Sequence, residues 1–284
     1  MANELHNFFA GQRTTIARSW KALMSHKPLF LYSVLFDLLF LFLAGLVNMV
    51  LVKKLTSIMY IIGGLLSKAS LDAGAGAGGA PSLFGLLSAA RAWGYVAQFA
   101  VLFLVWVLGL YFLYCFFHGL SWRLAYGMTG RPRALLAFTK QFFRVNIVWY
   151  ALFIILNAIL FVVSYLTTSI AKKSEVSVHW LWYAPFLLLL YIALVSYSRS
   201  EETGTRSNDA LRLAWTGKRK LFPAYLLILL LFAVIDIILF GVSYLGQIPL
   251  VIVGFLLFVP AFTAARVYWL GWFTKETHKD ANKR

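Results

Sequence analysis

The chain has 284 residues, of which 61% are hydrophobic and only 13% are charged. Soluble domains are nearer to half apolar and a quarter charged, so the composition excludes an ordinary soluble domain and favours several bilayer spans of roughly 20 residues each. A net charge of +16 would suggest nucleic acid in a soluble protein. No solvated basic platform is visible, however, and cations beside spans suit cytoplasmic loops and anionic headgroups, so no nucleic-acid partner is expected.

The N-terminal segment predicts a retained first span. The first apolar run begins near Leu29, after four basic residues, and continues to about Val52. That length is too great for the core of a cleavable signal peptide. The single cysteine, Cys115, lies inside another apolar run. One thiol forms neither an internal disulfide nor a Cys-rich metal site, so Cys115 is interpreted as a small buried residue.

Six apolar runs predict six transmembrane helices in an all-α, polytopic membrane protein. They cover residues 29–52, 95–118, 146–170, 180–198, 222–245 and 248–272. Nineteen Lys and Arg residues fall on one side of these runs and six on the other. Basic residues collect in cytoplasmic loops, so we expect both termini in the cytoplasm and the chain in the plasma (inner) membrane. Five tryptophans near the span ends are interpreted as an interfacial aromatic belt: Trp149, Trp180, Trp182, Trp269 and Trp272.

The outer loop after the first span contains a match to a dinucleotide fingerprint. Gly74–Gly79 reads G-x-G-x-x-G, but no strand precedes it and the next acidic residue after Asp72 is Glu175. The fingerprint needs both features, so the stretch is interpreted as a flexible tether. Residues 55–66 repeat apolar side chains at helical spacing. They predict a short amphipathic helix on the outer leaflet or capping the bundle, with a re-entrant segment as the alternative.

A weak threefold repeat divides a single transmembrane domain, residues 1–284, into pseudo-repeats 1–130, 131–205 and 206–284. A basic amphipathic stretch precedes each odd-numbered span: QRTTIARSWKALMSHKPLF, RPRALLAFTKQFFRVN and RSNDALRLAWTGKRKLFP. Each predicts an elbow helix in the cytoplasmic interface, followed by a hairpin of two spans; ordinary basic flanks without a separate helix are the alternative. The cations expected to contact anionic lipid are Arg13, Arg18, Lys21, Lys27, Arg131, Arg133, Lys140, Arg144, Arg212, Lys218, Arg219 and Lys220.

Two segments carry a resemblance to known families. SNDALRLAWTGKRKLFP precedes the fifth span, and FVPAFTAARVYW lies in the sixth. With the elbow-and-hairpin layout, they resemble six-span prokaryotic families typified by the glycerophosphodiester phosphodiesterase membrane domain and its uncharacterised relatives. The resemblance implies a fold and a membrane role. It carries over no catalytic residue, because no stretch here could fold as the soluble barrel that some relatives carry.

Four polar residues fall inside the expected spans: Asp37, Asn157, Asp236 and Arg266. Ionisable groups at membrane depth are costly and are candidates for function. One interpretation is a buried ion pair that fixes helix register. Asp236 lies roughly 12 Å from Arg266 in depth at about 1.5 Å per residue, which is long for a direct pair, although an arginine side chain can reach by snorkelling. Asp37 is the other candidate partner for Arg266. One alternative is a quasi-threefold polar centre of Asp37, Asn157 and Asp236 that binds a cation or relays protons. The others are contact with lipid headgroups, or protonated aspartates that have no partner.

No catalytic constellation accompanies these residues, and neither a metal nor a cofactor is expected. The five histidines lack metal-ligand spacing, and His118 is interpreted as an interfacial residue. Small residues in 254–265 predict a central sixth span. We therefore expect a non-enzymatic membrane protein that organises lipid or a partner protein at the cytoplasmic interface. The alternative is a small permease that uses the polar centre. The expected partners are anionic lipids, with a protein partner or a homo-oligomer left open.

Overall fold

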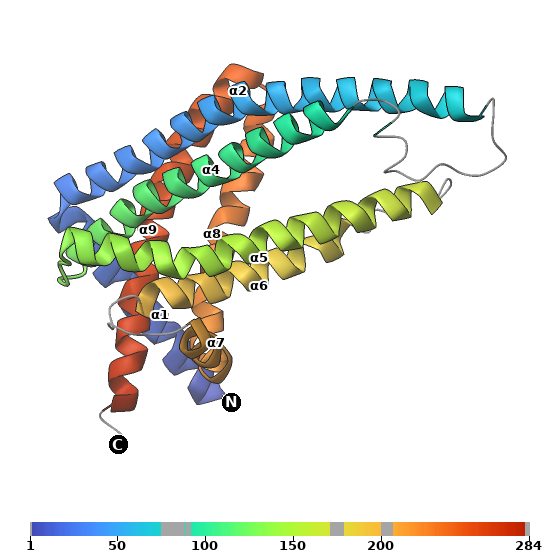
Figure 1. Ribbon diagram of the computed structural model, residues 1–284. Helices are drawn as coiled ribbons and strands as arrows, with labels where there is room; N and C mark the ends of the chain where they lie inside the picture. The colour runs from blue at the N-terminus through green and yellow to red at the C-terminus, as the bar shows by residue number, and fades with distance from the viewer. Residues whose placement is uncertain (1, 75–87, 89–91, 171–178, 200–206, 282–284) are drawn as a thin grey trace. The chain divides into compact units, whose positions relative to one another are not determined.

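The computed structural model describes residues 2–74, 88, 92–170, 179–199 and 207–281. These residues form α-helices joined by short turns, and they contain no β-strand (Figure 1). The glycine-rich stretch 75–79 lies outside the described residues. The helices are α1 (Ala2–Ser25), α2 (Lys27–Gly74), α4 (Trp93–Met128), α5 (Leu135–Ile170), α6 (His179–Arg199), α7 (Ser207–Thr216), α8 (Lys218–Ser243) and α9 (Gln247–Ala281).

Five of these helices are long and apolar enough to cross a membrane: α2, α4, α5, α8 and α9. Their most apolar windows are largely exposed, with side chains such as Leu230, Ile237 and Leu256 standing on the outer surface. An apolar surface of this extent is not stable in water. The chain is therefore a multi-pass membrane protein. The apolar part of α6 within the described side chains, Tyr183–Arg199, is shorter.

The chain forms two compact units. The smaller unit is residues 39–114, and the larger unit is residues 1–38 together with residues 115–284. In the 39–114 unit the later part of α2 lies beside the first part of α4. The Trp106 Nε1 donates to Asn48 Oδ1 at 2.7 Å, and the Phe40 and Tyr114 rings meet edge to face. α2 is continuous to Gly74, so the separate outer helix predicted after Val52 is wrong. No proline interrupts residues 53–74, and nothing therefore stops the helix there.

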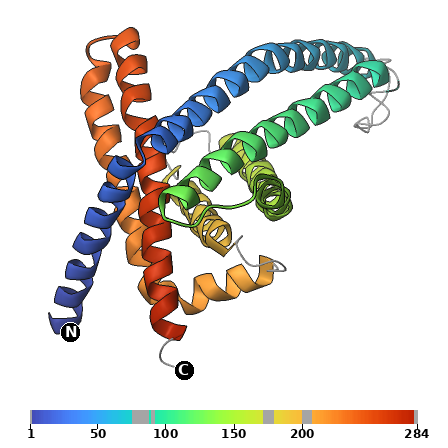
Figure 2. The same ribbon diagram turned by 90° about the vertical axis from the view of Figure 1, so that its left-hand side faces the viewer.

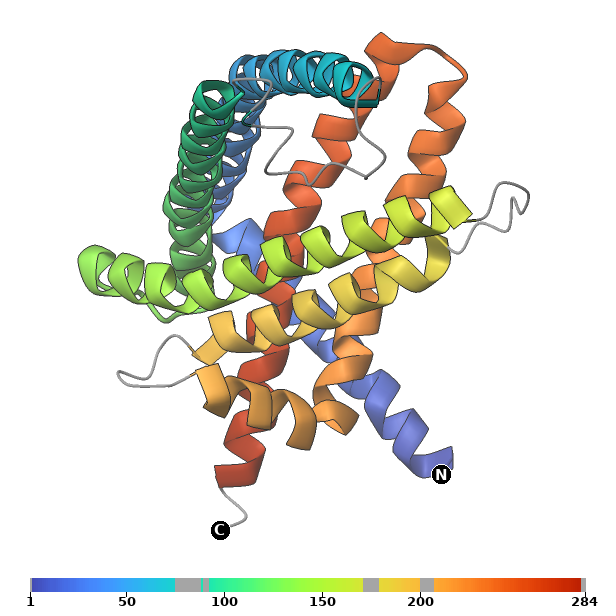
Figure 3. The same ribbon diagram turned by 45° about the vertical axis from the view of Figure 1, so that its right-hand side comes forward.

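The larger unit contains two helical hairpins and the short helices that flank them. α8 and α9 are joined by a tight turn in which Gly246 adopts a left-handed φ of 108°, and α5 lies beside α6 (Figure 3). α1 lies antiparallel to the C-terminal half of α9 (Figure 2). Lys275 Nζ donates to the carbonyl of Gly11 at 3.2 Å, and the absence of a side chain at Gly271 admits Thr15 and Ser19. α9 therefore contacts helices on more than one face, as expected for a central span.

The three basic stretches do not fold alike. α1 ends at Ser25 just before Pro28, and α7 ends at Thr216 just before Gly217, so the first and third stretches form separate helices. The second stretch does not, because α5 runs unbroken from Leu135 to Ile170. Pro132 lies before this helix, and the residues that follow contain no breaker. The separate elbow helix expected in the second repeat is therefore wrong.

Three tryptophans assigned to an interfacial belt are buried instead: Trp149, Trp269 and Trp272. The indole Nε1 of Trp269 donates to Ser198 Oγ at 2.6 Å, and that of Trp272 donates to the backbone carbonyl of Lys220 at 3.0 Å. An indole N–H needs an acceptor wherever its ring is buried. For Trp269 and Trp272 the protein supplies that acceptor, and these two rings join α9 to α6 and α8. The buried Nε1 of Trp149 has no hydrogen-bond partner among the described residues. The side chains of Trp180 and Trp182 lie outside the described part.

Candidate functional site

An ion pair between α2 and α9 forms the centre of the larger unit. Arg266 donates from Nη1 to Asp37 Oδ2 at 2.5 Å and from Nη2 to Asp37 Oδ1 at 3.0 Å. The Asp37 side chain is 2% exposed and that of Arg266 is 7% exposed. This is the two-pronged guanidinium–carboxylate geometry that fixes both groups in direction as well as distance. The structure thus joins Arg266 to Asp37 and not to Asp236.

α4 contributes two further polar groups to the same cluster. Ser121 Oγ donates to Asp37 Oδ1 at 3.0 Å. His118 Nδ1 lies 2.8 Å from Arg266 Nη2 and 3.2 Å from Asp37 Oδ1. The tautomer of His118 decides which of these contacts is a hydrogen bond: with its proton on Nε2, Nδ1 accepts from the guanidinium, and with a proton on Nδ1 it donates to Asp37. His118, expected at the membrane interface, contributes its partly buried ring to this cluster.

One helical turn away, Ser33 and Thr263 make a second link between α2 and α9. Their hydroxyl oxygens lie 3.0 Å apart and both side chains are fully buried. Residue 33 precedes residue 37 by four positions, and residue 263 precedes residue 266 by three. Such spacings place side chains on one face of a helix. The same spacing relates His118 to Ser121 on α4. This periodicity shows that the two residues share a helix face, but not that this face meets Asp37.

The chemistry open to this cluster is narrow. The Asp37 carboxylate already accepts three hydrogen bonds, two of them from a permanent cation. A carboxylate has about four acceptor sites, which leaves little capacity for a bound cation or a relayed proton. The arrangement is suited to locking α2, α4 and α9 in register.

The other two intramembrane candidates do not join Asp37. Asn157 on α5 is exposed, and its Nδ2 donates to the Phe153 carbonyl of its own helix at 2.7 Å. Asp236 on α8 is also exposed. The structure therefore gathers no buried centre from Asp37, Asn157 and Asp236.

A second buried polar network links α4, α5 and α6. Tyr197 donates its hydroxyl proton to Asn146 Oδ1 at 2.5 Å, and Tyr126 donates to the backbone carbonyl of Tyr197 at 2.7 Å. Asn146 Nδ2 donates to the carbonyl of Phe142 at 2.9 Å. Each of these polar atoms has a partner, as buried groups require. Asn146 and Asn157 both lie in the apolar run of α5, and the spacing of apolar residues does not show that Asn146 is buried and Asn157 exposed. The sequence therefore did not predict this network.

Most of the predicted lipid-contacting cations are exposed at the surface. Arg131 and Arg133 are partly buried, with the Arg133 guanidinium 5.9 Å from the Tyr126 ring centre. The remaining ten are exposed: Arg13, Arg18, Lys21, Lys27, Lys140, Arg144, Arg212, Lys218, Arg219 and Lys220. On α1 and around α7 they accompany exposed indoles, at 62% for Trp20 and 71% for Trp215.

No group of His, Cys, Asp and Glu within the described residues could hold a metal ion. Comparisons with protein-family models, with curated proteins and with solved structures find no match for this chain.

Proposed function

We propose that this chain is a non-enzymatic, multi-pass protein of the plasma (inner) membrane that organises anionic phospholipid at the cytoplasmic surface. One observation carries the proposal: α1 and α7 each combine exposed cations with a large exposed apolar side chain. Around α7, Leu211 and Trp215 are exposed, and Lys218 Nζ lies 3.9 Å from the Trp215 ring centre. A helix of this kind places its apolar side at the acyl boundary and its cations among the phosphates.

The proposal includes a membrane topology. α6 serves as a sixth span, α1 and α7 lie at the cytoplasmic interface, and both termini are cytoplasmic. The excess of Lys and Arg on that side supports the orientation. The permease alternative has less support, because Asn157 and Asp236 are exposed and separate from the Asp37 cluster.

The orientation is tested by labelling introduced cysteines. Ala10 and Leu245 are both exposed, and they lie at the start of the chain and at the α8–α9 turn. In sealed inverted vesicles, Ala10→Cys should react with an impermeant maleimide and Leu245→Cys should not. In intact cells the pattern should reverse. Reaction of both residues from one side would refute the topology.

The lipid role is tested in vesicles of mixed phosphatidylglycerol and phosphatidylcholine. Each cation at an anionic surface contributes about 1 kcal/mol, so the triple variant Arg212→Gln, Lys218→Gln, Arg219→Gln should lose most of its phosphatidylglycerol enrichment. The matched control is Lys53→Gln, Lys54→Gln, Lys68→Gln, which removes the same charge from exposed residues of α2. Equal enrichment around both variants would overturn the proposal.

A further inference from the structure

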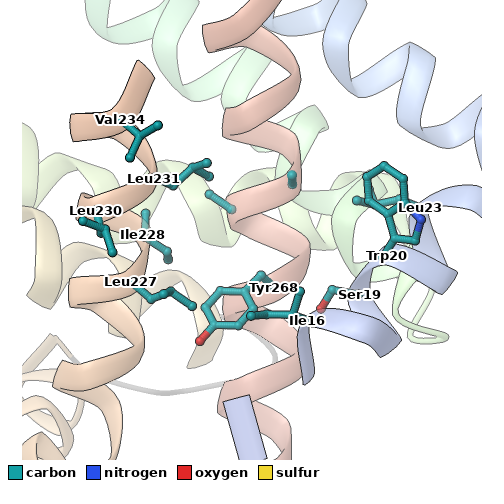
Figure 4. A pocket seen from close by; sticks show the side chains of 12 residues that line it. Ile16, Ser19, Trp20, Leu23, Leu227, Ile228, Leu230, Leu231, Val234 and Tyr268 are labelled. Carbon is teal, nitrogen blue, oxygen red and sulfur yellow. The ribbon is translucent and has the colours of Figure 1, made fainter. Parts of the chain in front are cut away.

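An apolar groove lies between α1 and α8, with α9 as its floor (Figure 4). Side chains from α8 line one side, residues from α1 line the other, and Tyr268 of α9 stands between them. The first of its two cavities has a volume of about 380 Å³, and its lining includes Leu23 of α1 and Val234 of α8. A neighbouring cavity of about 710 Å³ shares Ile16, Trp20, Leu227 and Leu230, and it reaches Gln12, Arg13 and Pro223. Both volumes lie in the range of roughly 300–1,000 Å³ that is usual for ligand sites.

The length of the groove matches one leaflet of a bilayer. Its lining runs along α8 from Pro223 to Val234. At about 1.5 Å per residue this is about 16 Å, and half of a hydrocarbon core of roughly 30 Å is about 15 Å. α8 begins with three consecutive basic residues, so the Pro223 end of the groove faces the side that carries the cations. The Val234 end reaches mid-span.

A buried polar group without a partner stands at the basic end. The Gln12 side chain is 6% exposed and lines the neighbouring cavity. Its Oε1 accepts a hydrogen bond from the Tyr268 hydroxyl, but its Nε2 has no hydrogen-bond partner in the described part of the chain. An unsatisfied buried donor is costly, so an acceptor is missing at this point. The exposed guanidinium of Arg13 lines the same cavity.

We propose that this groove binds one anionic phospholipid of the cytoplasmic leaflet. One acyl chain lies along α8 between Ile16, Trp20 and Leu230, and a phosphate or ester oxygen accepts from Gln12 Nε2 and pairs with Arg13. At the basic end, Gln12 Nε2 and the Arg13 guanidinium are donors, and the rest of the lining is apolar except for the hydroxyls of Ser19 and Tyr268. This is the polarity of such a lipid. This inference rests on the proposed lipid role. It adds a site that binds one lipid per chain to the general attraction of anionic lipid by the exposed cations.

The test uses the full chain in mild detergent, with phosphatidylglycerol and phosphatidylcholine of identical acyl chains as probes. Native mass spectrometry should show one phosphatidylglycerol retained in preference to phosphatidylcholine. Gln12→Glu keeps an oxygen for Tyr268 but replaces the free donor with an acceptor, and Ala17→Trp fills the groove from an exposed position. Loss of a hydrogen bond to a charged group should weaken retention about tenfold or more in Gln12→Glu.

The matched controls are Gln247→Glu and Ala233→Trp, which make the same changes at exposed positions outside the groove. They should retain the lipid as the wild-type chain does. A phosphatidylglycerol with a photoactivatable acyl chain should label the wild-type chain on peptides that contain Trp20 and Leu230, which locates the site without any variant.

Two results would overturn the groove site: wild-type retention in both Gln12→Glu and Ala17→Trp, or labelling spread evenly over the apolar helices. The α7 charge variant separates this inference from the proposed function. If only that variant loses phosphatidylglycerol enrichment in vesicles, the surface role stands and the groove site fails.

Discussion

Replacement of Asp37 by Asn should be among the most damaging conservative substitutions in this chain. The change removes the negative charge from a carboxylate that is 2% exposed and leaves the Arg266 guanidinium, 7% exposed, without a counter-ion. Two charge-assisted hydrogen bonds, at 2.5 and 3.0 Å, lose their ionic acceptor. Bonds to charged groups contribute roughly 1.5–3 kcal/mol each, and breaking one side of a buried ion pair costs about 3–5 kcal/mol. We expect a loss of about 4 kcal/mol in the free energy of unfolding.

The measurement is reversible unfolding in mixed micelles with increasing sodium dodecyl sulfate, followed by far-ultraviolet circular dichroism. Asp236→Asn is the matched control, because it makes the same chemical change at an exposed position. Its midpoint should lie within experimental error of wild type.

A double variant tests whether the loss of stability comes from the unpaired charge of Arg266 or from any substitution at these two positions. Asp37→Leu with Arg266→Met removes both charges together, and replacement of a buried pair by apolar residues is often neutral. The double variant should therefore be more stable than Asp37→Asn. Equal stability of Asp37→Asn and wild type, or a double variant no better than the single one, would refute the reasoning.

Three further predictions concern other positions. Tyr197→Phe removes a hydroxyl that donates to a buried amide at 2.5 Å, so unfolding should become easier by about 1–3 kcal/mol, whereas Tyr183→Phe at an exposed site should have no effect. Gly217→Ala would place a Cβ 2.9 Å from a backbone carbonyl and should lower the thermal midpoint, while Gly254→Ala, with no atom nearer than 4.0 Å, should not. Cys115 is fully buried, so it should resist an impermeant maleimide until the chain is unfolded; rapid labelling of the native protein would contradict its placement.

The membrane-crossing character of the chain could be read from the sequence because it follows directly from hydropathy. A backbone in hydrocarbon must satisfy its own hydrogen bonds, so long apolar runs form helices whatever their neighbours are. Five of the six expected runs coincide with helices that are long and apolar enough to span. Where helices begin and end was less predictable. Glycine and proline are the residues that most often end a helix. Gly217 separates α7 from α8, whereas α5 contains neither glycine nor proline and continues without a break.

The polar cluster could be anticipated in part. An arginine within a span needs a partner, and the sequence offered Asp37 and Asp236 as the two candidates. The participation of His118 and Ser121 could not be derived, because it depends on which face of α4 meets α2. The tryptophans show the same limit. An indole near a span end is satisfied equally by a headgroup or by a backbone carbonyl, and only the packing of α9 against α6 and α8 decides for Trp269 and Trp272.

The two sites on α9 occupy opposite faces of the helix. At about 100° per residue, Thr263 and Arg266 lie on one face, which meets α2 and α4, and Ala264, Ala265 and Tyr268 lie on the other, which floors the groove. Substitution of the ion pair therefore changes the stability of the unit without changing an atom of the groove lining. Conversely, Ala17→Trp alters the groove without touching the charge pair. A folded Asp37→Asn chain should accordingly still retain phosphatidylglycerol, and loss of the lipid in that variant, while α9 remains helical, would show that the register of α9 also controls the shape of the groove.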